Sequence, residues 1–488
     1  MSASLLAHRI GDEWIAETPG REDRNPAHPD DIVAYVSPAS ADHLRAAAAA
    51  ARAALPAWAA TPAPARGEIL YRAAALLAER AESIGRDLAR EEGKTLAEGI
   101  GETRRASAIL RYFGGQTSEP TGEVYASATP GTRLYTQRIP VGVVAVITPW
   151  NFPIAIPAWK VAPALAFGNT VLFKPASHTP LMGNHLVSAL VDAGLPAGVI
   201  GMVFAGGDLV EQEWIGNGAV DAVSFTGSGA VGRRLQAVAH SAHAKVQLEL
   251  GGKNSVIVAP DADMARAADL IVRGAMASAG QKCTSTASVI CIGSAQDAIR
   301  DAILERVRAL RIGDPLDPAT ALGPLIDAAA RDRVAGVVAD AEAAGARVLI
   351  RPDVPDVGAY HPPVVLGGVT PEMVIARDEV FGPVLSCIAA DDLHHALRIH
   401  NGVEFGMSGS IFTRDLATAE TFVAAARVGL IHVNGETAGA EPHVPFGGVK
   451  GSSSGSREQG KAAVEFYTQT RTVYVEGLPA LGPFDHQP

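Results

Sequence analysis

The feature that most constrains the fold is an alternation of short apolar runs and helical segments that begins at residue 141. Residues 141–147 form a continuous apolar run, as expected for a parallel strand that is covered on both faces. Strand-like runs follow at 169–173, 199–203 and 222–225, with a helical segment at 179–193 between the first two of these. Strands that alternate with helices predict an α/β domain built on a parallel sheet.

A second set of the same kind begins near Lys253. Strands are predicted at 255–258, 288–292, 364–366, 384–388, 409–412 and 430–433, with helices at 303–311, 328–343, 393–399 and 416–426. A chain of 488 residues is too long for one small core. The two sets therefore predict two α/β domains of parallel type.

The segments outside the alternation predict covering helices and a β arm. Residues 40–55 and 66–117 have the spacing of amphipathic helices, which we interpret as cover for a sheet. Residues 1–38 are polar with turn signals at 25–29, and we expect loops there. Short runs on either side of Pro130 and Gly131 predict a hairpin over 121–138, and the tail at 465–475 predicts one long strand. Because a hairpin is marginal alone, we expect it to pack on another domain or subunit.

Charge, hydropathy and cysteine usage exclude several classes of function. Lys and Arg number 41 against 52 Asp and Glu, a net charge of −11, which argues against a general nucleic-acid or membrane-surface binder. Residues 152–173 are the most apolar long segment, but three prolines and Lys160 make them a poor membrane span. No signal-peptide pattern is found at the N-terminus. Cys283, Cys291 and Cys387 lack CxxC spacing, so we expect no disulfide framework, no metal site and a cytoplasmic location.

Two separate stretches carry groups suited to covalent chemistry on a carbonyl. Cys283 lies among small polar residues at 280–284, and Glu249 lies among leucines and glycines at 248–254. A thiol nucleophile with a distant carboxylate base is a recurring catalytic pair. The alternatives are a small core cysteine and a half-buried strand glutamate with its head in water. Asn151, held between aromatic residues and prolines, is either an oxyanion donor or a turn former.

Glycine-rich and basic segments at strand ends indicate a nucleotide site. Residues 227–232 match GxGxxG between a strand and a helix, where backbone N–H groups attract phosphate, and the alternative is a glycine-rich turn without a ligand. The acidic residue that the standard fingerprint requires about 20 positions further on would be Glu249, which has a better claim as a base. Lys174 and Ser177 follow the strand at 169–173, at the edge where parallel sheets form cofactor crevices, although Lys174 could also be a solvated loop lysine.

Taken together, these motifs resemble the NAD(P)-dependent aldehyde dehydrogenase superfamily over nearly the whole chain. They stand in the family's order and spacing: PWNFP at 149–153, KPAS at 174–177, FTGS at 225–228, LELGGKN at 248–254, GQKCT at 280–284, EVFGP at 379–383 and PFGG at 445–448. The resemblance implies a dinucleotide-binding domain (1–117 and 141–251), a catalytic domain (252–464) and an oligomerisation arm (118–140 and 465–488). It also implies a homo-oligomer, either a dimer or a tetramer.

The resemblance implies a mechanism centred on Cys283. The thiolate attacks an aldehyde, and Asn151 and the backbone N–H of Cys283 stabilise the oxyanion. After hydride transfer to the nicotinamide, Glu249 activates water to release the acid, and its presence favours hydrolysis over transfer to coenzyme A. No histidine stands near Cys283 in sequence, so thiolate formation relies on Glu249, local N–H groups, Lys282 or the positive ring of the cofactor.

The resemblance also implies the cofactor site. Its residues are Thr148, Trp150, Lys174, Ser177, Gly227, Ser228, Glu379 and Phe381. Lys174 and Ser177 would lie at the adenine ribose. Gly227 and Ser228 would lie at the pyrophosphate, and Glu379 and Phe381 at the nicotinamide ribose. A glutamate often stands at position 177 in relatives specific for NAD, and Ser177 removes its repulsion of a 2′-phosphate. The cofactor is therefore NAD or NADP, and we predict that NADP is accepted, with a preference for NADP left open.

The implied substrate pocket is formed by Phe152, Trp159, Lys282, Thr284 and Phe446. Lys282 either pairs with a distal carboxylate on a semialdehyde, lowers the pKa of the thiol, or points to solvent. Residues 443–460 and 465–468 are most similar to the 2-oxoglutarate semialdehyde dehydrogenase branch. The chain departs from that branch at Ser456, where proline is expected, and at Lys282, where arginine is common. A neutral aliphatic or aromatic aldehyde is the alternative substrate.

Two other classes of function use the same residues differently. A thiol esterase would need Cys283 and Glu249 but would leave the nucleotide motifs without a purpose. A non-catalytic scaffold protein would have no use for Asn151, Glu249 and Cys283 together.

Overall fold

The alternation that starts at residue 141 forms a mostly parallel sheet in the computed structural model, which describes residues 3–477. At its centre is β8, which is buried along its whole length and pairs in parallel with β9 and β11. Antiparallel strands close both edges. Across the sheet the strands are β22 (Ser453–Ser454), β12 (Lys245–Glu249), β11 (Ala222–Thr226), β8 (Val143–Ile147), β9 (Thr170–Lys174), β10 (Ile200–Met202), β2 (His8–Ile10) and β3 (Glu13–Ile15).

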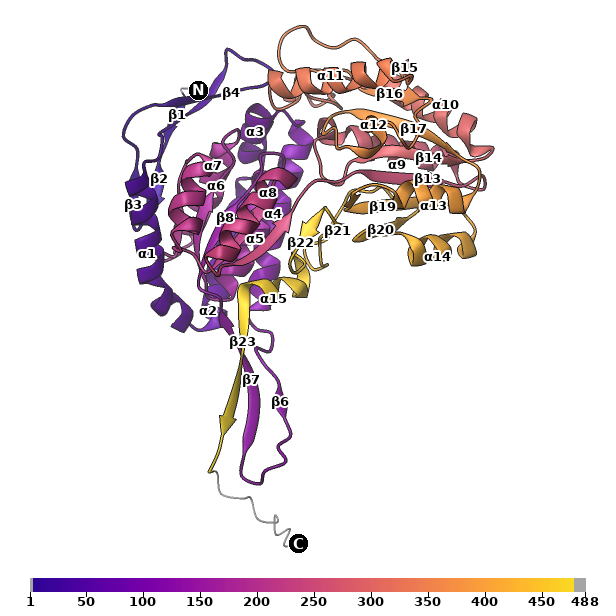
Figure 1. Ribbon diagram of the computed structural model, residues 1–488. Helices are drawn as coiled ribbons and strands as arrows, with labels where there is room; N and C mark the ends of the chain where they lie inside the picture. The colour runs from indigo at the N-terminus through magenta and orange to yellow at the C-terminus, as the bar shows by residue number, and fades with distance from the viewer. Residues whose placement is uncertain (1–2, 478–488) are drawn as a thin grey trace.

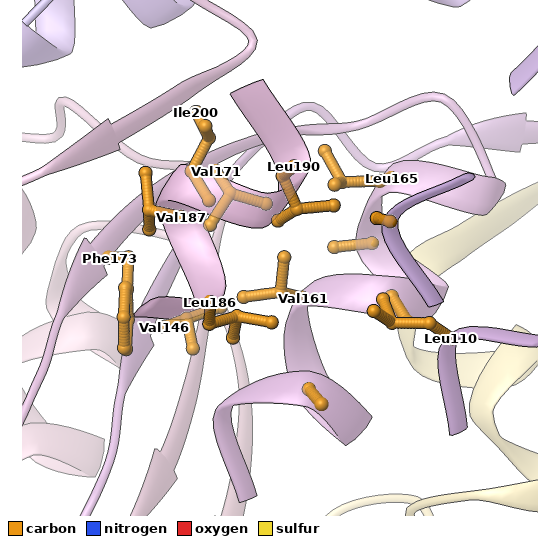
Figure 2. Packing of buried hydrophobic residues seen from close by; sticks show 14 of the residues in the cluster. Leu110, Val146, Val161, Leu165, Val171, Phe173, Leu186, Val187, Leu190 and Ile200 are labelled. Atoms are coloured by element: carbon orange, nitrogen blue, oxygen red, sulfur yellow. The ribbon is translucent and has the colours of Figure 1, made fainter. Parts of the chain in front are cut away.

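Side chains of β8 alternate between two cores, one on each face of this sheet. Val144 and Val146 pack with helices α2, α4, α5 and α6, and Figure 2 shows Val146 in this cluster with Val161 and Leu186. Val143 and Ala145 pack with α1, α8 and the π-helix η1 on the opposite face. Burial on both faces explains why the strand is continuously apolar. These helices are α1 (Ala41–Ala60), α2 (Ala63–Glu79), α4 (Leu96–Gln116), α5 (Ala155–Ala166), α6 (Pro180–Asp192), η1 (Glu211–Gly216) and α8 (Gly229–Ser241).

The second set of predicted strands forms a separate sheet in a second lobe (Figure 1). It is parallel except for β15 at one edge. Across the sheet the strands are β15 (Arg347–Ile350), β16 (Val364–Gly367), β17 (Val384–Ala390), β14 (Thr286–Ile292), β13 (Asn254–Val258), β19 (Ser408–Phe412) and β20 (Leu430–Val433). Its main helices are α9 (Met264–Met276), α10 (Ala295–Arg308), α11 (Ala328–Ala343), α13 (Leu393–Asn401) and α14 (Leu416–Ala425), which share one core with the strands. The α/β fold with parallel sheets is confirmed.

A thin three-stranded sheet projects from the first lobe (Figure 1). The predicted hairpin is confirmed as β6 (Val124–Tyr125) and β7 (Arg133–Pro140), and β23 (Thr468–Val475) pairs with β7 along its whole length. The predicted tail strand is wrong at its start, because residues 465–467 end the short helix α15 (Ala463–Tyr467). Phe466 and Tyr467 are both buried, and a helical turn directs two successive side chains inward where a strand would expose one. The last part of the predicted arm, 478–488, lies outside the described residues.

The expectation of loops over residues 1–38 is wrong. Five short strands form there: β1 (Ser4–Leu6), β2, β3, β4 (Arg21–Arg24) and β5 (Ile32–Val36). β2 pairs with β10, about 190 residues away, and β1, β5 and β4 make a small sheet of their own. Pairing partners this distant leave no local signal in the sequence. The turn signals at 25–29 do fall between strands.

The predicted helix over 66–117 is divided into α2, α3 (Ala81–Glu92) and α4, with Gly93 at a positive φ of 92° ending α3. The remaining short elements are α7 (Gly207–Val210), η2 (Ala277–Gly280), α12 (Val374–Arg377), β18 (Phe405–Gly406), β21 (Val449–Lys450) and η3 (Gly460–Ala462). Among residues 3–477, no helix is both long enough and apolar enough to cross a membrane.

Candidate active site

Cys283 is held on a strained turn that follows α9. Ser278 has a φ of 55° and Gly280 a φ of 71°, and a Cβ on Gly280 would lie 2.2 Å from the carbonyl oxygen of Gly382. Asn254 Nδ2 donates a hydrogen bond of 2.8 Å to the carbonyl oxygen of Cys283. Backbone in the left-handed region persists only where surrounding contacts fix it, so this turn sets the position of the thiol closely.

The thiol opens into a cavity of about 280 Å³ between the two lobes' sheets. This cavity brings together residues from 149–151, 226–228, 250–251 and 379–381, which are far apart in the sequence. Seven of the residues predicted for the site line this cavity: Trp150, Asn151, Gly227, Ser228, Cys283, Glu379 and Phe381. Trp150 and Phe381 meet edge to face, with their ring centroids 5.5 Å apart.

A second cavity, of about 320 Å³, continues the first along the ends of β8, β9 and β11. Five residues line both cavities: Pro149, Trp150, Thr226, Gly227 and Ser228. Thr148, Lys174 and Ser177 line the second one. Together the two cavities form a groove, and all eight predicted cofactor residues lie on its walls. Carboxyl ends of parallel strands are where such sheets bind nucleotides.

The charges along this groove fit a phosphate-bearing ligand. Ser228 caps α8, and the N-terminus of that 13-residue helix faces the groove, where its partial positive charge favours an anion. Burial and the nearby Arg21 guanidinium lower the pKa of Lys174 to about 8, so this lysine is not a freely solvated loop residue. At the other end, the Glu379 carboxylate accepts a hydrogen bond of 2.9 Å from the backbone N–H of Gly252.

The thiol of Cys283 is strongly disfavoured as a thiolate in this environment. Burial, and then the carboxylates of Glu379 and Glu249, raise the pKa of Cys283 to about 12, while its own backbone N–H lowers it. That N–H is the group predicted to bind the oxyanion. Lys282 is buried, and burial lowers its pKa, so the alternative that it points to solvent is wrong.

Glu249 is buried at the end of β12, which excludes a side chain with its head in water. Its Oε2 accepts a hydrogen bond of 2.5 Å from the hydroxyl of Ser453 on β22. Burial, followed by repulsion from Glu458, raises the pKa of Glu249 well above its ordinary value, and the Ser453 hydroxyl opposes this shift. A carboxyl group with a raised pKa is suited to taking a proton near neutral pH.

Asn151 is buried and fixed by contacts that the sequence did not indicate. One N–H of its amide donates to the carbonyl oxygen of Gln281 at 2.9 Å. Lys94 Nζ donates to the backbone oxygen of Asn151 and to Glu102, each at 2.7 Å. Glu102 in turn accepts from the backbone N–H groups at the start of α5. The interpretation of α4 as cover for a sheet is therefore incomplete, since this helix also holds the loop that carries Asn151.

The predicted substrate residues are only partly brought together. The rings of Trp159 and Phe446 lie 5.5 Å apart, and Lys94 Nζ lies 4.2 Å from the ring centroid of Phe152. The carbonyl oxygen of Thr284 accepts a hydrogen bond from Thr437. Within residues 3–477, none of the five predicted substrate residues lines the groove, so they lie apart from the predicted cofactor residues.

Several groove residues were not predicted. His178 directly follows the motif at 174–177, and that position was a usable signal. Arg234 lies on α8, two residues beyond the glycine-rich segment. Arg333 lies on α11 and donates to the carbonyl oxygen of Val380 at 2.7 Å, which fixes the loop that carries Glu379. No sequence pattern marked Arg333, because its helix is distant along the chain.

The three cysteines are free, and the part of the chain from residue 3 to residue 477 contains no group of three or more His, Cys, Asp or Glu side chains placed to hold a metal ion. The fold and the site thus define an α/β enzyme with a half-buried thiol at one end of a nucleotide-sized groove.

Comparisons with known proteins identify the family. The model of the aldehyde dehydrogenase family matches residues 14–473, and the chain belongs to this family. It is 42% identical to the alpha-ketoglutaric semialdehyde dehydrogenase of Bacillus subtilis (strain 168), covering 96% of this chain and 97% of that protein. It is 41% identical to the alpha-ketoglutarate semialdehyde dehydrogenase of Haloferax volcanii, covering 95% and 98%. The crystal structure of an NAD-dependent aldehyde dehydrogenase from Sinorhizobium meliloti superposes with a TM-score of 0.94 at 33% identity, covering 99% and 97%.

These matches confirm the resemblance that the motifs indicated. The protein is an oxidoreductase that converts an aldehyde to a carboxylic acid.

Proposed function

We propose that this protein oxidises a semialdehyde with a distal carboxylate, of the 2-oxoglutarate semialdehyde type, with NAD or NADP as the hydride acceptor. The observation that carries the proposal is the continuous groove that runs from Lys174 and Ser177 to Cys283. A dinucleotide has two ends, and the groove offers basic groups at one end and a thiol beside aromatic rings at the other. The two semialdehyde dehydrogenases named above support the substrate class.

Each catalytic residue has one task in the proposed reaction. Cys283 adds to the aldehyde carbon to form a thiohemiacetal, and the free N–H of Asn151 and the backbone N–H of Cys283 bind the oxyanion. A nicotinamide dinucleotide, when bound, supplies the hydride acceptor. The thioester left on Cys283 is hydrolysed by water that Glu249 deprotonates. The hydrogen bond from Ser453 favours the ionised carboxylate of Glu249 and so opposes the effect of its burial.

Lys282 is our candidate for recognition of the distal carboxylate. It is adjacent to the nucleophile, it is buried, and burial lowers its pKa. A buried ammonium is compensated by an ionic partner in good geometry, and the distal carboxylate of a semialdehyde would supply one. The neutral aldehyde remains the alternative, supported by the aromatic pair of Trp159 and Phe446.

The assignment is tested by following reduced-nicotinamide absorbance with NAD or NADP and a panel of 2,5-dioxopentanoate, succinic semialdehyde, propanal and benzaldehyde. We expect the highest kcat/KM with an acidic semialdehyde. Lys282→Ala should raise KM for the acidic substrates by about 10-fold or more and leave propanal within about 2-fold, since a charged hydrogen bond contributes about 1.5–3 kcal/mol. Lys282→Arg should restore the preference, and Lys461→Ala, an exposed lysine, should behave like the parent. Equal effects on acidic and neutral aldehydes would remove the semialdehyde proposal.

The domains and the arm have separate roles in this proposal. We infer that residues 1–117 and 141–251 bind the dinucleotide, that 252–464 carry the nucleophile, and that 118–140 with 465–488 assemble a dimer or tetramer. The exposed apolar side chains of Val124, Tyr125 and Tyr474 on the arm support assembly, because exposed apolar side chains that gather on one element mark interaction surfaces. A cytoplasmic location would keep the catalytic thiol reduced.

A further inference from the structure

A third cavity, of about 190 Å³, adjoins the groove beside its basic end. Ala176 and Ser177 line both spaces, and Arg21 from β4 lines the new one. Arg21 comes from the N-terminal strands, 156 residues before Ser177 in the sequence. Its guanidinium donates a hydrogen bond to the carbonyl oxygen of Ser177, so it is held at this end of the groove.

The charges around this end of the groove are unbalanced. Arg21 lies close enough to Lys174 and His178 that its charge contributes to lowering both of their pKa values, after the larger effect of burial. Across residues 3–477, no ion pair joins a carboxylate to Arg21 or to Lys174. Two acids lie in this region. Asp327 pairs with His178 at 3.2 Å. Asp23 is buried and shares a hydrogen bond with Glu91, and the charge of Arg21 lowers its pKa slightly against the larger effect of burial, but it forms no ion pair with Arg21.

Two cations that repel each other at a partly desolvated site favour an anion that contacts both. Ser177 has a short neutral side chain, which leaves room and adds no negative charge. A guanidinium presents paired N–H donors that match phosphate oxygens, whereas an ammonium acts as a point charge. A dianionic phosphate bound here would relieve the repulsion between Arg21 and Lys174.

We propose that Arg21 binds the 2′-phosphate of NADP together with Lys174 and thereby sets a preference for NADP over NAD. This inference rests on the proposed function, because it assigns a role at the adenosine end of the same groove. The guanidinium keeps its hydrogen bond to Ser177 through one N–H group and offers its other donors to the phosphate.

The test uses titration calorimetry of the full-length protein with adenosine 2′,5′-bisphosphate and with AMP, which differ only in the 2′-phosphate. The parent should bind the bisphosphate at least about 10-fold more tightly. Arg21→Ala should reduce that ratio by about 10-fold or more and leave AMP within about 2-fold. Arg21→Gln, which retains a donor for the Ser177 carbonyl but no charge, should show the same loss and serves if Arg21→Ala does not fold.

The matched control is Arg24→Ala. Arg24 lies on the same strand, is exposed, and bonds to Glu22 and to the carbonyl oxygen of Pro29 rather than to the groove. It should leave the ratio unchanged. The ratio of kcat/KM for NADP and NAD should follow the binding ratio across the variants.

Two results would overturn the role of Arg21. One is a preference for the bisphosphate that survives in Arg21→Ala and Arg21→Gln, and the other is an equal loss of AMP and bisphosphate binding. In both cases aldehyde oxidation by the parent would leave the proposed function standing. A parent that binds neither nucleotide and reduces neither cofactor would remove the proposed function itself.

Discussion

At the scale of single residues, the site is defined by groups whose pKa values are moved by burial. The pKa of Cys283 is raised to about 12 and that of Glu249 well above its ordinary value. Glu249 contributes to the shift of Cys283, and Glu458 contributes to both shifts. The protonated thiol is thus the favoured form of Cys283 before substrate binds, and burial shifts Glu249 toward its neutral form. Two measurements test these shifts.

The first measurement concerns the hydrogen bond between Ser453 and Glu249. The hydroxyl stabilises the ionised carboxylate, so Ser453→Ala should raise the pKa of Glu249 further. The basic form then appears only at higher pH, and the acid limb of the pH profile of kcat should move to alkaline pH by about one unit. Ser454→Ala, whose hydroxyl accepts from Gln236 instead, should leave the limb in place. Identical limbs in parent and Ser453→Ala would show that Glu249 is not the titrating base.

The second measurement concerns the thiol. With a pKa of about 12, the thiolate fraction of Cys283 in the free enzyme rises about 10-fold per pH unit through the neutral and mildly alkaline range. Alkylation by iodoacetamide, followed by mass spectrometry of the Cys283 peptide, should therefore accelerate from pH 7 to pH 10 without a plateau. A plateau near pH 8.5 would mean that the thiol is not shifted upward.

At the scale of elements, the loop that carries Asn151 depends on a buried ion pair. It joins Lys94, just before α4, to Glu102 within α4. Both side chains are almost completely buried, and Glu92 lies close to the same ammonium. Removing one partner of such a pair leaves an uncompensated buried charge, which costs about 3–5 kcal/mol. The helix thus supports the candidate active site as well as the core.

We expect Lys94→Met to lower the free energy of unfolding by about that amount and to reduce kcat, because the Asn151 carbonyl loses its donor. Guanidinium unfolding at fixed protein concentration measures the first effect. Arg104→Met is the control, since Arg104 on the surface of α4 pairs with the exposed Glu82 of α3. This substitution should change the free energy of unfolding by no more than about 1 kcal/mol. A Lys94→Met variant as stable as the parent would contradict this role.

The elements also show what the sequence alone could predict. β8 was predictable because burial on both faces leaves a continuous apolar run, and the residues at strand ends were predictable because parallel strands bring their carboxyl ends to one edge. The edge strand β22, which brings Ser453 to Glu249, and the pair of Lys94 and Glu102 were not predicted. Both depend on contacts between distant segments, and pairing of this kind is fixed by the assembled core rather than by local pattern.

At the scale of the whole molecule, the two lobes meet at the thiol and the arm extends away from both (Figure 1). The arm carries exposed apolar groups at its strands, with Val124 80% and Tyr474 66% exposed. We expect these groups to be covered by another subunit in the assembled protein.

Light scattering after size-exclusion chromatography should give the mass of a dimer or tetramer for the parent. The double variant Val124→Glu, Tyr474→Glu should shift toward smaller species, because charges without partners oppose burial at an interface. Val357→Glu, at a similarly exposed valine in a loop of the second lobe, should keep the parent mass. A double variant with unchanged mass would show that the arm does not assemble the protein.

The most direct test of the whole account is the rate of aldehyde-dependent cofactor reduction by Cys283→Ser, compared with Cys387→Ala, which removes a buried thiol on β17. The account predicts that Cys283→Ser loses at least about 10³-fold in kcat while Cys387→Ala stays active. A Cys283→Ser variant that oxidises aldehydes at the parent rate would contradict it.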